Sequence, residues 1–172
     1  MAGKTPRKKR VEKIYAFIDS QNLNVSVKNQ GWKLDFSRFR VYLRDKYSVG
    51  KCYLFVGYVP KYQNLYKKLR KDGYLLVFKP TLKVKDKREN TYKGNVDAEL
   101  VLHTMIEFPN YDKAVIVSGD GDFHCLVEYL RRKDKLMKIV IPDIHSYSSL
   151  YRNFWNYLAF VNYLREKLEE RK

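Results

Sequence analysis

Carboxylates follow two strongly apolar segments of the chain, at the point where each segment ends. Asp19 closes the run IYAFID, and Asp120 and Asp122 follow AVIVSG in the turn SGDGDF. A fourth acid, Asp97, comes after KGN at the start of an amphipathic stretch. Grouped carboxylates repel one another at neutral pH, and their hard oxygen atoms are ligands that Mg²⁺ or Mn²⁺ prefers. These four residues therefore indicate a divalent-metal site.

The elements that position these acids follow from hydrophobic periodicity. Strands are predicted at 14–19, 51–59, 74–80, 113–119 and 136–142, and helices at 20–29, 35–47, 61–72, 96–108 and 123–133. This alternation predicts an α/β fold, a three-layer α/β/α sandwich with a central, mainly parallel sheet. The strands that carry Asp19 and Asp120 are strongly apolar, so we expect them to be central and adjacent. Their carboxyl ends would then meet at one edge of the sheet.

Two stretches are less regular. Segment 81–95 is polar and is expected to form a hairpin or a loop. Residues 148–172 fit either one long helix or a helix, a short strand at 158–161 and a final helix, and we favour the interrupted form. No linker or internal repeat divides the chain, so we expect one domain over 14–172, preceded by a flexible basic arm at 1–13.

Positive charge is concentrated in two segments. The 172 residues include 35 Lys and Arg against 19 Asp and Glu, a formal net charge of +16. Segments 1–13 and 61–93 carry +5 and +8 of that excess. Such an excess indicates a polyanionic partner, with nucleic acid favoured over an anionic membrane surface.

In segment 61–93 the basic residues are interleaved with aromatic residues. Cations attract phosphates and aromatic faces stack on unpaired bases, so this mixture favours single-stranded RNA or DNA. The alternative is that the aromatics face the core, which we expect for Phe78 and Tyr66. The candidate strand-binding residues are Lys67, Lys68, Arg70, Lys83, Lys85 and Arg88.

Several classes of protein are disfavoured. No apolar run approaches the roughly 20 residues of a membrane-spanning helix. Cys52 and Cys125 are far apart in the sequence, which favours a reduced, cytoplasmic protein and offers no zinc-finger spacing. No serine-hydrolase, P-loop or dinucleotide-binding motif is present.

Each acid alone also has a structural explanation. Asp97 and Asp122 are of the residue type that caps helices, and Asp-Gly-Asp suits a turn. Their joint arrangement in so basic a chain favours metal-assisted hydrolysis of a phosphodiester, in which the metal activates water and neutralises the phosphate.

The motifs AFIDSQNL (16–23), YKGNVDAELVLH (92–103) and VIVSGDGDF (115–123), with the weaker VIPDIHSYSSLYRNF (140–154), resemble the NYN domain family. Its LabA-like members are similar to PIN-domain nucleases. The resemblance implies a PIN-like fold and a divalent-metal-dependent ribonuclease acting on single-stranded RNA.

Carried over to this chain, the resemblance implies that Asp19, Asp97, Asp120 and Asp122 bind Mg²⁺ or Mn²⁺. Asn22 is implied to orient an acid or the substrate, Ser118 to hold the loop, and Lys93 to contact a phosphate. In many relatives a further acid stands where this chain has His103. That departure keeps open the alternative of a catalytically weak RNA-binding regulatory module. Whether the protein is a monomer or a homodimer stays undetermined.

Overall fold

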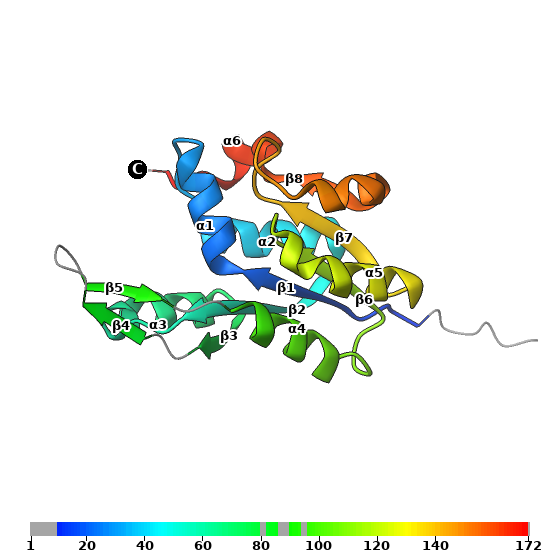
Figure 1. The fold of residues 1–172 in the computed structure, drawn as a ribbon, viewed down its shortest axis with the longest axis horizontal. Helices are drawn as coiled ribbons and strands as arrows, with labels where there is room; N and C mark the ends of the chain where they lie inside the picture. The colour runs from blue at the N-terminus through cyan, green and yellow to red at the C-terminus, as the bar shows by residue number, and fades with distance from the viewer. Residues whose placement is uncertain (1–9, 80–81, 86–89, 94–95, 172) are drawn as a thin grey trace, which may run out of the picture.

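The computed structural model describes residues 10–79, 82–85, 90–93 and 96–171, and its centre is a parallel sheet (Figure 1). Six strands lie in the order β3-β2-β1-β6-β7-β8, and every neighbouring pair is parallel. Their bounds are β1 Ile14–Asp19, β2 Val49–Gly57, β3 Tyr74–Lys79, β6 Lys113–Val117, β7 Leu136–Ile141 and β8 Leu158–Phe160. The predicted adjacency of the two central strands is confirmed, because β1 pairs directly with β6.

Helices cover both faces of this sheet and complete the predicted three-layer sandwich. One face packs against α1, α2, α3 and α6, and the other against α4, α5 and η3. The α-helices are α1 Ser20–Asn29, α2 Phe36–Tyr47, α3 Gln63–Lys71, α4 Asp97–Ile106, α5 His124–Arg132 and α6 Arg165–Leu168. The 3₁₀ helices are η1 Pro60–Tyr62, η2 Gly121–Phe123, η3 Ser149–Tyr157 and η4 Val161–Leu164.

Strand β1 shows why the sequence of a central parallel strand is a continuous apolar run. All six of its residues are buried, because helices cover both sides of it. Ile14, Ala16 and Ile18 pack on the face of α1 and α2, whereas Tyr15 and Phe17 pack on the face of α4 and α5. Side chains alternate along a strand, so the next residue, Asp19, belongs to the α4 and α5 face.

Local sequence signals set the ends of α2 and α3. The Asp35 carboxylate caps α2 by accepting hydrogen bonds from the backbone N–H groups of Ser37 and Arg38, at 2.9 and 3.1 Å. Gly73 follows α3 with a φ of 94°, a conformation that a residue with a Cβ adopts only with strain. Asp35 therefore fixes the start of α2, and Gly73 marks the end of α3.

The structure also describes parts of the two less regular stretches. Strands β4 Leu82–Lys85 and β5 Asn90–Lys93 pair antiparallel, so the polar segment forms a hairpin. The hairpin lies on the side of the molecule toward which β1 points (Figure 1). The C-terminal region is interrupted as expected, because β8 separates η3 from η4 and α6.

Across the described ranges, no helix has both the length and the apolar character that crossing a membrane requires.

Candidate metal centre

The four aspartates meet at the carboxyl edge of the sheet. Asp19 is the last residue of β1, and Asp120 lies three residues beyond the end of β6. These strands pair in register up to Ile18 and Val117, so the segments that leave them start side by side. Asp97 is the first residue of α4, which covers the same face of the sheet. We refer to Asp19, Asp97, Asp120 and Asp122 as the acidic edge.

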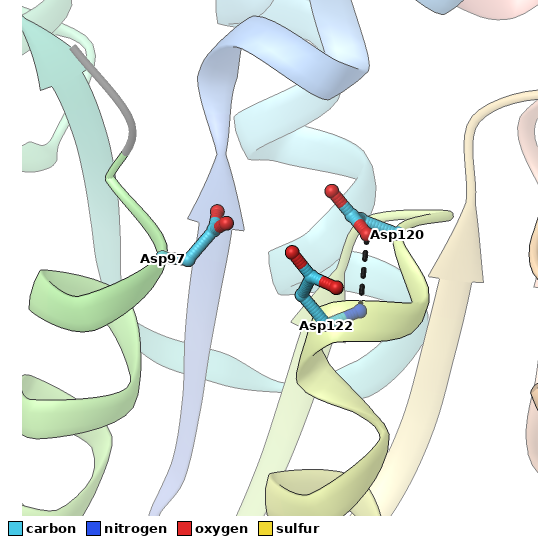
Figure 2. A group of neighbouring side chains, drawn as sticks. All are labelled: Asp97, Asp120 and Asp122. Atoms are coloured by element: carbon cyan, nitrogen blue, oxygen red, sulfur yellow. Dashed lines mark hydrogen bonds between the residues drawn. The ribbon is translucent and has the colours of Figure 1, made fainter.

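Three of these acids form a close group. One carboxylate oxygen each from Asp97, Asp120 and Asp122 lie within 4.8 Å of one another. Figure 2 shows that the three side chains come from α4 and from the turn that leads into α5, and that they converge on one space. Hard oxygen donors at this separation fit a divalent cation such as Mg²⁺ or Mn²⁺.

Helix capping does not account for two of the three. The N-cap of α4 is Val96, without a side-chain hydrogen bond, so Asp97 does not cap its helix. The N-cap of η2 is Asp120, whose carboxylate accepts a hydrogen bond from the backbone N–H of Asp122 at 3.0 Å. The cap orients Asp120, and Asp122 is left with its side chain exposed.

Asp19 lies beside this group rather than in it. Its Oδ1 accepts a hydrogen bond from the backbone N–H of Asn22 at 3.0 Å, and its Oδ2 accepts one from the Ser118 hydroxyl at 3.4 Å. Only 5% of the residue is exposed. Burial, followed by the charges of Asp97 and Asp120, raises the pKa of Asp19 to about 6, although its hydrogen bonds oppose the shift. A nearby cation would stabilise its ionised form.

Ser118 and Asn22 connect the two central strands. The Ser118 hydroxyl is fully buried and accepts a hydrogen bond from the backbone N–H of Asp120 at 3.1 Å while it contacts Asp19. The Asn22 side-chain oxygen accepts a hydrogen bond from the backbone N–H of Gly119 at 2.9 Å. Both polar side chains therefore hold the loop after β6 against the end of β1, and Asn22 contacts the loop backbone.

A cavity of 590 Å³ opens beside the acids. Asn22, Asp120 and Asp122 line one side of it. The other side is formed by residues of the loop before η3 and the start of η3, which the sequence reasoning did not select: Ser146, Tyr147, Ser148 and Leu150. The motif at 140–154 contains one acid, Asp143, and no regular periodicity, so it does not identify individual positions of the cavity wall.

Close packing holds this loop against the acidic turn. A Cβ on Gly121 would lie 2.9 Å from the Ser148 Cβ, so the approach requires glycine. The backbone N–H of Ser148 donates to the Gly119 carbonyl at 2.9 Å. The buried Tyr151 hydroxyl donates to the Asp120 carbonyl. Burial raises the pKa of Tyr151, which keeps that hydroxyl protonated as a donor.

His103 lies about two turns along α4 from Asp97 and packs on aromatic rings. Its ring centroid is 5.7 Å from that of Phe55 and 6.5 Å from that of Tyr53. Within the described part of the chain it is not a member of the three-acid group. His103 therefore packs against β2, on the side of α4 that faces this strand.

The residues predicted to bind the nucleic-acid strand belong to different elements of the fold. Lys67, Lys68 and Arg70 are exposed on α3, and the Arg70 guanidinium lies 5.5 Å from the centre of the Phe78 ring. Tyr66 is buried, as expected, with its ring 4.8 Å from that of Phe78. Lys83, Lys85 and Lys93 belong to β4 and β5, where only the backbone is described, and Arg88 lies outside the described residues.

Comparison with known proteins identifies the family. The model of the NYN domain matches residues 13–156. The chain belongs to the NYN domain family. This NYN domain is 29% identical over 141 residues to the low amplitude and bright protein LabA of Synechococcus elongatus, with 78% of this chain and 76% of that protein covered. Membership suggests a nuclease-type domain, and therefore a nucleic acid as substrate.

The fold of this NYN domain also occurs in a solved structure. A protein of unknown function from Vibrio parahaemolyticus superimposes with a TM-score of 0.69, over 92% of this chain and 96% of that one. The two sequences are 23% identical, so this likeness concerns the fold alone.

Proposed function

We propose that this NYN domain is a ribonuclease that hydrolyses phosphodiester bonds of single-stranded RNA with Mg²⁺ or Mn²⁺. The observation that carries the proposal is that one carboxylate oxygen each of Asp97, Asp120 and Asp122 lie within 4.8 Å of one another. Membership of a nuclease-type family and the net charge of +16 support a nucleic acid as the substrate.

In this mechanism Asp97 and Asp120 would hold the cation, and Asp19 would contribute a further negative charge from the end of β1. The chemistry supplied by a bound cation would be a lower pKa for the attacking water and neutralisation of charge on the scissile phosphate. Asp122 is the exposed member of the group, so it faces solvent as a ligand or as an acceptor of the water's proton. Ser118 and Asn22 keep the two sides of the site together through their hydrogen bonds.

Basic residues bring the strand to the acids. Lys67, Lys68 and Arg70 are exposed on α3, and Lys83, Lys85, Arg88 and Lys93 belong to the same basic segment of the sequence. Phosphate contacts of this kind give affinity without sequence preference.

The test is incubation of labelled single-stranded RNA with the purified protein in Mn²⁺ or in EDTA. We expect metal-dependent cutting that Asp97→Asn abolishes. The control is Asp134→Asn, the same chemical change at the amino end of β7, where a positive φ of 53° also suits asparagine. Wild-type protein that binds RNA tightly and never cuts it would contradict the proposal.

That outcome would favour the second candidate, an RNA-binding regulatory module with weak or no catalysis. The observation in its favour is that His103, at a position where the family resemblance implies an acid, packs on Phe55 and Tyr53.

A further inference from the structure

A second cavity opens at the same edge of the sheet, on the opposite face from Asp97. It measures 290 Å³ and lies between α1, the end of β2 and α3. Its rim begins at Ser20 and Gln21, the two residues that follow Asp19. These two residues of its rim therefore follow the acidic edge directly in the sequence. The cavity itself lies on the side of the sheet that α1 and α3 cover.

This cavity continues into a third one of 340 Å³. We refer to the two together as the α1–α3 groove. They share five lining residues, which are Asn24, Phe36, Tyr62, Leu65 and Leu69. Volumes of this size suit small units such as single nucleotides rather than a folded partner.

The walls of the groove combine apolar surface with polar groups. Tyr62 and Leu65 are 44% and 46% exposed, while Leu69 forms a buried floor. Opposite them, α1 presents the amides of Gln21 and Asn24, and neither side chain has a hydrogen bond within the described residues. A flat ring with polar edges, such as a nucleobase, can stack on the aromatic face while its edge forms hydrogen bonds with these amides.

Positive charge lies along the groove. Lys61 is 5.1 Å from the centre of the Tyr62 ring, and Lys28 and Lys68 line the far end. The acids at that end are already engaged: Asp35 caps α2, Asp72 accepts a hydrogen bond from the Ser37 hydroxyl, and Glu170 pairs with Lys33. Lys28 and Lys68 have no ion pair among the residues that the structure describes, so they remain available to phosphates.

We propose that the α1–α3 groove binds unpaired bases of the RNA strand whose backbone is cut at the acidic edge. Bases stack on Tyr62 and beside Leu65, the amides of Gln21 and Asn24 bond to base edges, and Lys28 and Lys68 contact phosphates. The strand thus crosses the sheet edge from one face to the other. The inference takes from the proposed function only its substrate class, single-stranded RNA.

The experiment compares two labelled 12-mers by fluorescence anisotropy in EDTA, where no cutting occurs. One is oligouridylate, and the other is the same sugar-phosphate backbone without bases. We expect wild type to bind oligouridylate at least about fivefold more tightly, since stacking of a single base is worth that much or more. Tyr62→Ala and Gln21→Ala should each reduce this preference. Tyr163→Ala, a control tyrosine that is 76% exposed and lines neither cavity, should not.

Equal affinity for the two 12-mers would overturn the inference, as would an equal loss in Tyr62→Ala and Tyr163→Ala. Base-dependent binding without metal-dependent cutting would support the groove and contradict the ribonuclease. Metal-dependent cutting with no preference for bases would support the ribonuclease and contradict the groove. Failure of one proposal is therefore distinguishable from failure of the other.

Discussion

The acidic edge and the α1–α3 groove begin at consecutive residues, Asp19 and Ser20, yet they are built differently. The acidic edge depends on two adjacent central strands and on buried hydrogen bonds through Ser118 and Asn22. The groove depends on exposed side chains of helices, among them Tyr62 and Leu65. If both proposals hold, one face of the sheet carries out the chemistry and the other holds the strand. The two functions should then be separable by mutation.

The largest expected effect is a double dissociation between the two regions. Asp120→Asn should lower the single-turnover cutting rate by about a thousandfold or more, because a catalytic metal contributes several kcal/mol. It should leave the affinity for oligouridylate in EDTA unchanged or slightly higher, since a negative charge is lost. Tyr62→Ala should weaken binding, while the rate at saturating protein stays within about twofold. Loss of both properties in either variant would show that the regions are not separable.

Metal should stabilise the fold through the acidic edge alone. A ligand at a hundred times its dissociation constant adds about 2.7 kcal/mol to the free energy of unfolding. For a domain of this size, that corresponds to a rise in Tm of roughly 5–10 °C with Mn²⁺. Differential scanning fluorimetry should show the rise in wild type and Tyr62→Ala but not in Asp97→Asn. A rise of equal size in Asp97→Asn would place the metal elsewhere.

Asp19 should limit stability when metal is removed. Burial raises its pKa in the folded state to about 6, above its ordinary value of 3.8, so its ionised form costs stability at neutral pH. This cost is present above about pH 6 and disappears as the pH falls toward the ordinary value. Asp19→Asn in EDTA at pH 7 should therefore be more stable by roughly 1–3 kcal/mol. Urea titrations at pH 7 and pH 5 should show the gain shrinking at the lower pH.

A gain that stayed constant between these two pH values would contradict the assignment of the effect to the Asp19 carboxylate. Ser20→Ala, a change at the neighbouring residue on the groove side, serves as the control and should show no such pH dependence.

Much of the acidic edge was predictable because its strands are unambiguous. The runs that end at Asp19 and Ser118 are buried on both faces, so their sequences had to be continuously apolar, and central strands had to be neighbours. The position of Asp19 beside the three-acid group was not predictable. It depends on which side chains its oxygens contact, here Asn22 and Ser118, and no periodicity encodes that.

The groove and the loop before η3 were not predictable for a different reason. The sequence of segment 61–93 shows both its charge and its aromatic residues. It does not show that Tyr62 and Leu65 line a groove with α1, because that depends on how α3 packs in the fold. The approach of Ser148 to Gly121 joins residues distant in the sequence, and only the packed loop reveals it.

The smallest expected effect concerns the charge at the far end of the groove. For single strands, each phosphate that is neutralised contributes about 0.7 to the slope of log affinity against log salt. Lys68→Ala should therefore reduce the slope for oligouridylate by about 0.7 and weaken binding only a few-fold. Lys46→Ala, an exposed lysine in the last turn of α2 that lines neither cavity of the groove, is the matched control.

The two variants have the same net charge, so they separate local contact from overall attraction. If the +16 acts only as a diffuse field, Lys68→Ala and Lys46→Ala should change the slope equally. If the groove holds the strand, only Lys68→Ala should change it, and the base-free 12-mer should show a smaller change because its phosphates are not held beside Tyr62. Equal slopes in both variants would therefore contradict a phosphate contact at Lys68.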